Sequence, residues 1–281
     1  MFGSHLSIVG GLQNALLKAE ELGFSTVQVF TKNQQQWKCG ELAAGEVGEW
    51  KRQRRKVGFE KTVAHGSYLI NLASPEEGMW RKSVEMMVVE MRRCERLGIE
   101  YLVVHPGSHM GAGVEAGVKR VAEAIDLVHG EVRAKGVMLC LEATAGQGSS
   151  VGCRLEELAE IMEKVKRVGG VGVCLDTAHL FAAGYDFRGR KYEGFMKEVE
   201  RVVGRGVVKV VHLNDSKRGL GSRVDRHEHI GRGAIGMEGF VGWVRDERWR
   251  GAPKILETPK GRTKGGREWD EVNLSRLRGL L

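Results

Sequence analysis

The sequence lacks the features that mark membrane, secreted and disulfide-bonded proteins. No apolar run approaches the about 20 residues that a membrane-spanning helix needs. The opening stretch, MFGSHLS, has no basic, apolar and small-residue signal pattern. The five cysteines are odd in number and form no CxxC motif, so the sequence favours neither a disulfide framework nor a cysteine metal site. These absences indicate an intracellular, reducing compartment and no membrane partner.

Linkers and nucleotide-binding glycine motifs are also missing. The 4 prolines are scattered, and no low-complexity tract or composition break divides the 281 residues. A single (β/α)8 barrel runs to about 250 residues, so we expect one domain over residues 1–281. A doubly wound open sheet is the alternative fold. No GxGxxG follows the first β-rich run, which disfavours that alternative.

The sequence does contain an alternation of short β-rich runs with helical patterns. The β-rich runs are residues 2–7, 26–31, 61–67, 101–107, 137–143, 171–177, 207–215 and 253–258. Apolar residues recur at helical spacing in residues 12–22, 83–97, 114–128, 155–165 and 192–203. Eight strand–helix repeats predict an α/β fold, the (β/α)8 TIM barrel.

Six of the eight predicted strands end in side chains that can bind a metal ion. These side chains are His65, His105, Glu142, Asp176, His179, His212 and Glu257. The carboxyl ends of barrel strands converge on one face, so we expect all of them in one basin. A single histidine at a strand end is as readily explained as a core residue. Six successive strand ends of this kind are hard to explain by chance.

The stretch GSRVDRHEHIGRG, residues 221–233, has neither strand nor helix periodicity. On its own it is as readily a solvated charged loop. Placed on the same face, it adds Asp225 and His227 and brings the candidate ligands to nine. Nine imidazole and carboxylate ligands suit two or three ions that share a carboxylate, and they favour zinc or manganese.

The charge is biased toward basic residues late in the chain. The net charge is +8, and residues 217–267 hold 13 Lys and Arg against 6 Asp and Glu. Basic excess in a loop-rich region suggests a polyanionic partner, most simply a nucleic acid backbone.

Several long motifs resemble the endonuclease IV family of apurinic/apyrimidinic endonucleases. They are FTKNQQQW, HGSYLINLA, HPGSH, LEATAGQG, CLDTAHLFAAGYD, HLNDSK, GSRVDRHEHIGRGAIG and ILETP, which span essentially the whole chain. The resemblance implies a zinc-dependent DNA-repair barrel that hydrolyses the phosphodiester 5′ to an abasic site. The expected products are a 3′-hydroxyl and a 5′-deoxyribose phosphate, and the enzyme also cleans blocked 3′ ends.

The resemblance also implies a role for each candidate residue. One zinc would bind His65, His105 and Glu142, and a second would bind Glu142, Asp176, His212 and Glu257. A third would bind His179, Asp225 and His227, with manganese as an alternative at one site. Glu142, as the shared ligand, and Glu257, as a ligand and proton acceptor, are the predicted catalytic residues. Gln34, Gln35, Tyr68 and Leu69 match the family's DNA-insertion loops, although Tyr68 and Leu69 taken alone are as readily core residues. As cations, Arg223, Arg226, Arg232, Lys32 and Lys217 are candidate contacts to DNA phosphates.

Three positions depart from the family pattern. Ala143 stands where many relatives carry Asn, Gly66 where some bacterial members carry Asp, and Gln35 where some carry Arg. The departures affect hydrogen bonds around the ligands and insertion into DNA, while the ligand set is complete.

Two other functions fit parts of the pattern. A metal-dependent sugar isomerase or epimerase uses the same barrel with one or two metals, and a DNA-binding protein could have lost catalysis. Double-stranded DNA with abasic sites or blocked 3′ ends is the expected partner of a monomer. HGSYL and LETPK look more like fungal than bacterial members, which would place the protein in the nucleus and mitochondrion rather than in a bacterial cytoplasm.

Overall fold

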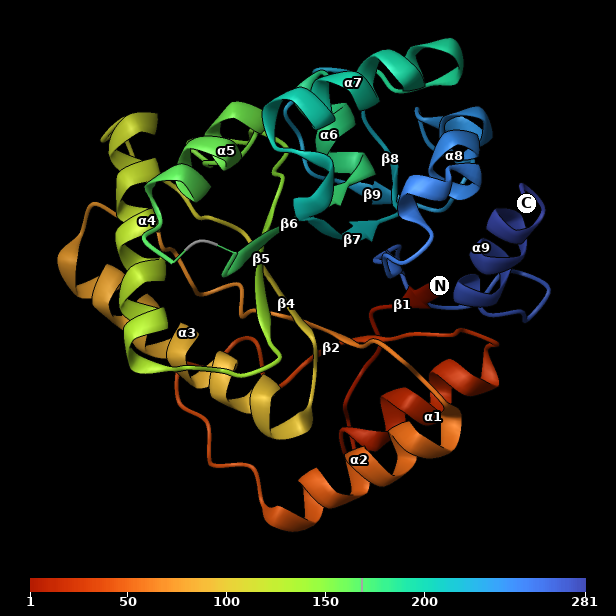
Figure 1. The fold of residues 1–281 in the computed structure, drawn as a ribbon. Helices are drawn as coiled ribbons and strands as arrows, with labels where there is room; N and C mark the ends of the chain where they lie inside the picture. Colours follow the sequence, from red (N-terminus) through yellow and green to blue (C-terminus); the bar gives the residue numbers. More distant parts are fainter. Residues whose placement is uncertain (168) are drawn as a thin grey trace.

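In the computed structural model, which describes residues 1–167 and 169–281, eight short parallel strands lie side by side in the order β1-β10-β7-β6-β5-β4-β3-β2. The two outer strands of this order also meet. A parallel bridge joins His5 to Gln28, and the amide of Leu6 donates to the carbonyl oxygen of Gln28 at 2.9 Å. The sheet is therefore closed into a barrel (Figure 1), which confirms the predicted fold and excludes the open sheet.

Each barrel strand coincides with one predicted β-rich run, but each is shorter than predicted. The strands are β1 (Phe2–Ser4), β2 (Gln28–Phe30), β3 (Val63–His65), β4 (Tyr101–Val104), β5 (Met138–Glu142), β6 (Val171–Asp176), β7 (Val208–His212) and β10 (Lys254–Leu256). The polar residues at the carboxyl ends of the strands are either the last residues of the hydrogen-bonded segments or come directly after them. Those ends are therefore free to form the loops of the site.

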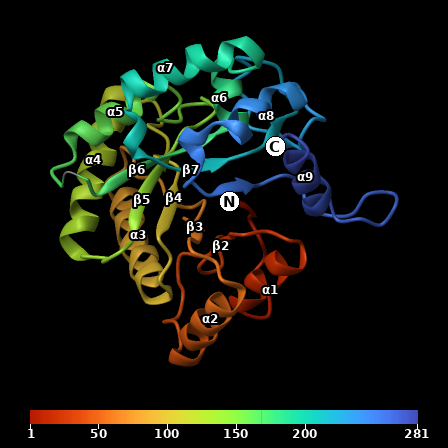
Figure 2. The ribbon, with the colours of Figure 1, turned by 45° about the vertical axis from the view of Figure 1, so that its right-hand side comes forward.

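Helices connect the strands and cover the outside of the barrel (Figures 1 and 2). They are α1 (Gln13–Glu21), α2 (Ala44–Val57), α3 (Glu77–Leu97), α4 (Val114–Glu131), α5 (Leu155–Lys164), α6 (Thr177–Ala183), α7 (Tyr192–Val202), α8 (Gly236–Arg245) and α9 (Trp269–Arg278). The five predicted helices are confirmed within a few residues, apart from α3. It begins at Glu77 because the carboxylate of Glu76 accepts hydrogen bonds from the amides of Gly78 and Met79.

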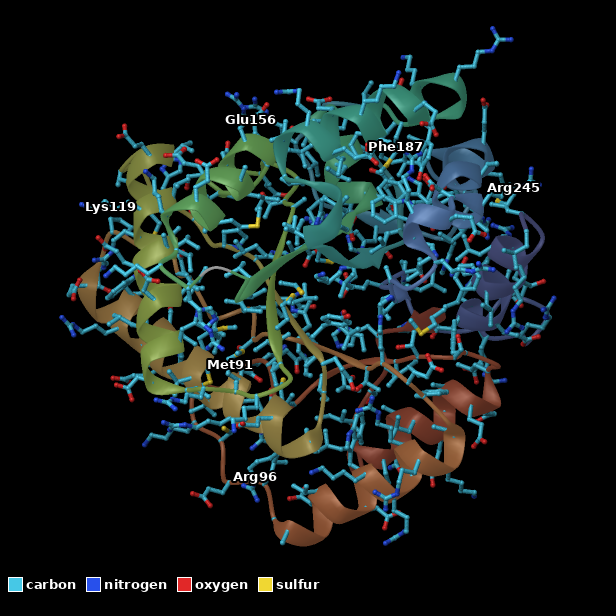
Figure 3. The ribbon with its side chains drawn as sticks, viewed as in Figure 1. Met91, Arg96, Lys119, Glu156, Phe187 and Arg245 are labelled. Carbon is cyan, nitrogen blue, oxygen red and sulfur yellow. The ribbon has the colours of Figure 1, made fainter. Side chains whose placement is uncertain are left out.

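The hydrophobic core has two parts. The barrel interior is filled by buried residues of alternate sheet positions, namely Val63, Val103, Cys140, Cys174, Val210 and Ile255. The larger part lies between the sheet and the helices and includes Met91 and Phe187, whereas Lys119 and Glu156 project outward from their helices (Figure 3). Cys140 and Cys174 behave as small apolar residues, as expected from their sequence context. None of the helices in the described residues is long and apolar enough to cross a membrane.

The charged stretch 221–233 is held by a two-stranded hairpin outside the barrel. Strand β8 (Asp215–Ser216) pairs antiparallel with β9 (His227–Glu228). The amides of Gly221 and Arg223 donate to carbonyl oxygens of α6, so this loop is docked on the barrel. A two-residue strand is too short to leave a periodic signal, which explains why the sequence pattern showed no strand here.

Candidate metal centre

The nine predicted ligands gather at the carboxyl ends of the barrel strands. His65, Glu142, Asp176 and His212 are the last residues of β3, β5, β6 and β7, and His105 and Glu257 directly follow β4 and β10. His179 lies in the first turn of α6. Its backbone amide donates to the carboxylate of Asp176 at 2.9 Å, so one candidate ligand caps the helix that carries another. Asp225 and His227 come from the docked loop.

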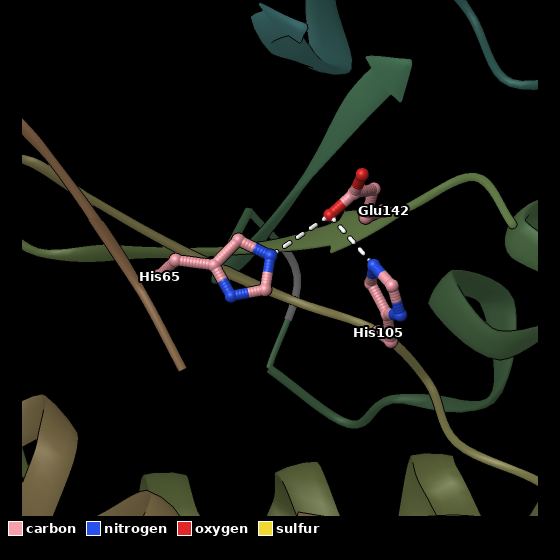
Figure 4. A group of neighbouring side chains, drawn as sticks. All are labelled: His65, His105 and Glu142. Carbon is pink, nitrogen blue, oxygen red and sulfur yellow. Dashed lines mark hydrogen bonds and ion pairs between the residues drawn. The ribbon is translucent and has the colours of Figure 1, made fainter. Parts of the chain in front are cut away.

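Glu142 is the centre of the cluster. It is fully buried, and its Oε2 lies 3.1 Å from Nε2 of His65 and 3.1 Å from Nε2 of His105 (Figure 4). Its other oxygen, Oε1, lies 3.1 Å from Nδ1 of His212 and 3.1 Å from Nδ1 of His179. A carboxylate with imidazoles at both oxygens is arranged to be shared between two cations.

A second group forms around His212. Its Nδ1 lies 3.1 Å from Oε2 of Glu257 and 3.8 Å from Oδ2 of Asp176. Glu142, Asp176, His212 and Glu257 each offer one ligand atom, and these atoms all lie within 4.8 Å of one another. The set matches the second site implied by the family resemblance.

The third group joins the charged loop to α6. Oδ2 of Asp225 lies 3.2 Å from Nε2 of His179, and Oδ1 lies 3.3 Å from Nε2 of His227. The two Nε2 atoms are 3.4 Å apart. Asp176 also places an oxygen within 4.8 Å of both imidazoles, so the third group has a carboxylate that the sequence assigned to the second group alone. Asp225 and His227 thus face candidate ligands, which disfavours the alternative of a merely solvated loop.

The tautomers of four histidines fit a cation. His65, His179 and His227 each have Nδ1 within 3.2 Å of a backbone carbonyl oxygen, and His212 has Nε2 2.9 Å from the amide oxygen of Gln28. A carbonyl oxygen only accepts, so in the neutral imidazole the other ring nitrogen carries the lone pair. Those nitrogens face carboxylates, an arrangement that either a metal ion between them or a second proton on the ring makes favourable. Tetrahedral ligands at about 2.1 Å from zinc are about 3.4 Å apart, close to the observed separations.

The charges of the metal-free centre are strongly coupled. Burial alone raises the pKa of Glu142, but the charges of His105 and His212 outweigh it and hold that pKa well below its usual range. Burial also raises the pKa of Asp225, but the hydrogen bond and the charge of His179 outweigh this effect and lower that pKa to about 2. Burial of His179 lowers its pKa, but Asp176 and Asp225 outweigh this effect and raise the pKa well above its usual value. Protons therefore occupy the places of cations when no ion is bound.

Four polar residues that sequence analysis did not select position the ligands. Asn214 donates to Oδ2 of Asp176 at 2.7 Å and accepts from the amide of Glu257 at 2.7 Å. Gln147 accepts from the amide of Asp225 at 3.0 Å. The buried carboxylate of Asp215 accepts from the amides of residues 216, 233 and 235, which holds the base of the charged loop.

The fourth of these residues is Gln28, on β2. Its amide group contacts both His212 and Glu257. Asn214, Asp215 and Gln147 lie inside the motifs HLNDSK and LEATAGQG, so membership in these motifs could have identified them from the sequence. Gln28 lies in an ordinary β-rich run.

A pocket of about 440 Å³ opens beside the centre. His65, His105, His179 and Asp225 line it, together with Tyr68 and residues of the loops after β3, β4 and β5. His105 and Asp225 are more than one third exposed, whereas Glu142 is fully buried. The buried carboxylate is therefore reached from this pocket, past the exposed candidate ligands His105 and Asp225.

Of the predicted insertion residues, Tyr68 lines the same pocket as the candidate ligands, and Gln34 and Gln35 line another pocket together with His5. Tyr68 is 68% exposed and packs edge-on against Phe30, with ring centroids 5.3 Å apart. Leu69 and Gln34 are half-buried, and Gln35 is exposed. The hydroxyl of Ser67 donates to the carbonyl oxygen of Gln34 at 2.6 Å, which joins the two loops.

The predicted phosphate contacts have different surroundings. Arg223 and Arg226 are exposed, and Arg226 lines the pocket. Arg232 is exposed and its guanidinium lies over Trp269, 5.0 Å from the ring centroid. The prediction for Lys32 is wrong, because its ammonium is buried and donates to the carbonyl oxygens of residues 33 and 36 within its own loop.

Three histidines outside the ligand set have local roles. His5 lies beside Glu257, with Nδ1 3.3 Å from Oε1. His109 accepts from the amides of residues 111 and 113 and shapes the loop after β4. His229 stacks on Trp269 with a centroid separation of 3.8 Å, so it anchors the charged loop to α9.

Ala143 and Gly66 keep a function through their backbone. Both supply the carbonyl oxygen that accepts from a ligand histidine, Ala143 to His179 and Gly66 to His65, each at 2.9 Å. The side chains absent at these two positions are therefore not needed to orient those rings.

Comparison with known proteins first defines the class. Residues 16–276 match the family described as Xylose isomerase-like TIM barrel. A D-tagatose 3-epimerase-like protein shares this fold with a TM-score of 0.73 at 18% identity, over 99% of this chain and 96% of that one. This likeness shows the fold alone.

Closer relatives define the family. The chain is 44% identical over 281 residues to a protein of Chloroflexus aggregans named "Probable endonuclease 4", covering 100% of this chain and 97% of the relative. The crystal structure of endonuclease IV from Thermus thermophilus matches with a TM-score of 0.86 at 39% identity, over 99% of this chain and 98% of that one. The chain belongs to the endonuclease IV family. These relatives are bacterial, so the fungal interpretation has no support.

Proposed function

We propose that this protein hydrolyses the phosphodiester 5′ to abasic sites in double-stranded DNA, and that it acts as a monomer in base excision repair. The products are a 3′-hydroxyl and a 5′-deoxyribose phosphate, and the same site removes blocking groups from 3′ ends. The observation that carries the proposal is the convergence of eight imidazole and carboxylate side chains around a ninth, the buried carboxylate of Glu142, beside an open pocket. Full-length similarity to proteins named endonuclease 4 supports it.

We assign three ions of zinc type, with manganese as an alternative at one site. The first would bind His65, His105 and Glu142, and the second Glu142, Asp176, His212 and Glu257. The third would bind His179, Asp225 and His227, which all approach within 3.4 Å. When bound, such ions act as Lewis acids that activate water at neutral pH and neutralise phosphate charge.

The positions of the bound ions would be set by the protein's own residues. Glu142 holds imidazoles at both oxygens and so sets the spacing of two sites. Glu257 presents Oε2 to the same space as His212 and is the proposed proton acceptor. Burial raises the pKa of Glu257, but the charge and hydrogen bond of His212 outweigh it and hold that pKa well below its usual range. Asp225 completes the exposed side, where the phosphate would enter.

The surrounding loops supply lesion recognition in this proposal. An abasic nucleotide has lost its pairing, so turning it out of the helix costs less than turning out an intact one. The exposed ring of Tyr68, with Leu69, Gln34 and Gln35, would occupy the space left in the duplex. Arg223, Arg226 and Arg232 would contact phosphates on the strand that enters the pocket.

A sugar epimerase is the alternative that the shared fold suggests. Such an enzyme needs one or two ions, and the third ligand group, with its dedicated loop, has no purpose there. A DNA-binding protein without catalysis would have no reason to keep a buried carboxylate among four imidazoles, because such a cluster is costly to bury without cations.

The test is an incision assay on a duplex that carries one abasic site and a label at the 5′ end of the damaged strand. We expect one cut, 5′ to the lesion, with a 3′-hydroxyl end that a polymerase extends. The same assay on a 3′-phosphoglycolate end tests end cleaning. No cut in the abasic duplex, together with turnover of ketohexoses, would replace the proposal with the epimerase alternative.

A further inference from the structure

The ring of His212 is oriented by a side chain, whereas the rings of His65, His179 and His227 are oriented by the backbone. Gln28, fully buried on β2, places its amide oxygen 2.9 Å from Nε2 of His212. A backbone carbonyl is present whatever the side chain, but this acceptor depends on residue 28 being Gln. The orientation of His212 is therefore sensitive to a single substitution.

The same amide also fixes Glu257. Nε2 of Gln28 donates to Oε1 of Glu257 at 2.6 Å, so only Oε2 faces His212. The amide cannot be turned over, because its oxygen would then face the Glu257 carboxylate and its nitrogen would face the His212 ring. One carboxamide thus determines the tautomer of one ligand and the presented oxygen of the other.

From these contacts we infer that Gln28 is the positioning residue of the second metal site, through its simultaneous hydrogen bonds to His212 and Glu257. The inference rests on the proposed metal centre and adds a residue outside the ligand set. Gln28 also forms the bridge with His5 that closes the barrel, so its backbone is fixed by the fold and its side chain is fixed by its partners. Residues of this kind typically change metal affinity by 10- to 100-fold when they are replaced.

The test measures metal affinity rather than incision. In Gln28→Leu, which removes the carboxamide and leaves a branched apolar side chain one atom shorter, one of the three ions should be held about 10- to 100-fold more weakly in chelator competition. Gln28→Glu keeps the acceptor for His212, so it should recover part of the lost affinity. The control is Gln53→Leu on α2, since Gln53 is buried and its Nε2 has no hydrogen-bond partner among the described residues. Cobalt(II) substitution reports the geometry of the site, and the absorption bands of Gln28→Leu should change while those of Gln53→Leu should not.

The outcomes separate this inference from the proposed function. If the wild-type protein binds no ions, the metal centre itself is wrong. If the wild type binds its ions and Gln28→Leu binds them equally tightly with the same cobalt spectrum, the positioning role of Gln28 is wrong and the centre stands. If Gln28→Leu does not fold, as judged by thermal melting, the Gln28→Glu variant provides the test. That variant should bind one ion more weakly than wild type, and wild-type affinity would overturn the inference.

Discussion

Oδ2 of Asp225 lies 3.2 Å from Nε2 of His179, although one residue is on a charged loop and the other is in the first turn of α6. The loop reaches α6 because Asp215 and the β8–β9 hairpin hold its base. The charged stretch that looked like a solvated turn is thus part of the centre.

Replacing Asp225 with Asn should keep the fold and greatly lower incision. The barrel core does not include this loop, but the third group loses its anionic ligand at the exposed edge. Groups that stabilise developing charge are each worth about 10²–10³ in rate. The measurement is single-turnover incision of an abasic duplex by variants with matched thermal melts. Glu228→Gln is the control, because Glu228 follows His227 on the same strand and its side chain accepts from the amide of His229. Near-wild-type incision by Asp225→Asn would show that this loop is an ordinary charged turn with no role in catalysis.

Removing Glu142 should disturb two ions together, whereas His227→Ala should loosen mainly one. The reason is that Glu142 contacts the imidazoles of two groups through its two oxygens. Elemental analysis after gel filtration gives the ions per chain. Glu90→Ala serves as the control, since Glu90 is a buried carboxyl that accepts a hydrogen bond from Thr31 and is not one of the candidate ligands. Loss of equal numbers of ions from Glu142→Ala and His227→Ala would disprove the shared-ligand arrangement.

Stability should depend on pH in opposite directions with and without metal. The pKa of His179 and His212 in the folded, metal-free protein lies well above the ordinary 6.5. Their stabilisation is therefore complete below about pH 6.5 and is lost as the pH rises through the raised pKa. Metal ions compete with these protons, so zinc should stabilise the protein more as the pH rises.

Thermal melts with zinc or with chelator, between about pH 6 and about pH 9, test this expectation. The carboxylates affect stability at low pH. Because the pKa of Asp225 is lowered to about 2, its contribution to the stability of the folded protein is lost only in strong acid. A difference in Tm between the two forms that stays constant across this range would show that protons and ions do not share the site.

DNA binding should be strongly dependent on salt, with part of the dependence due to the exposed arginines. Replacing Arg223 or Arg226 with Ala should lower the slope of log affinity against log salt by about one unit, because each phosphate contact releases counterions. Lys119→Ala is the control, since Lys119 projects from the outer surface of α4 (Figure 3). Unchanged slopes for both arginine variants would remove them from the DNA interface.

The barrel could be predicted from the sequence because each buried strand is a short apolar run that ends in a polar residue. His65, His105 and Glu142 were found in this way, since periodicity shows where a strand ends. The same signal does not show which buried polar residue faces another strand. Gln28 looks like an ordinary strand residue, and only closure of the barrel brings it against His212.

The wrong expectations have the same origin. Lys32 was expected to contact phosphate because it is a cation in a loop, but its four-carbon stem lets the ammonium reach the carbonyl oxygens of its own loop. The additional carboxylate of the third group, Asp176, could not be assigned because its Oδ2 lies 3.8 Å from both Nδ1 of His212 and Nε2 of His227, a proximity that only the three-dimensional structure shows.

The most direct test of the central claim follows incision while the ions are removed and returned. The protein is stripped with chelator, its metal content is measured, and zinc is restored in known amounts before single-turnover incision of an abasic duplex. We expect incision to disappear in the stripped protein and to return as zinc approaches three ions per chain. Full incision by protein that elemental analysis shows to be free of metal would contradict the account.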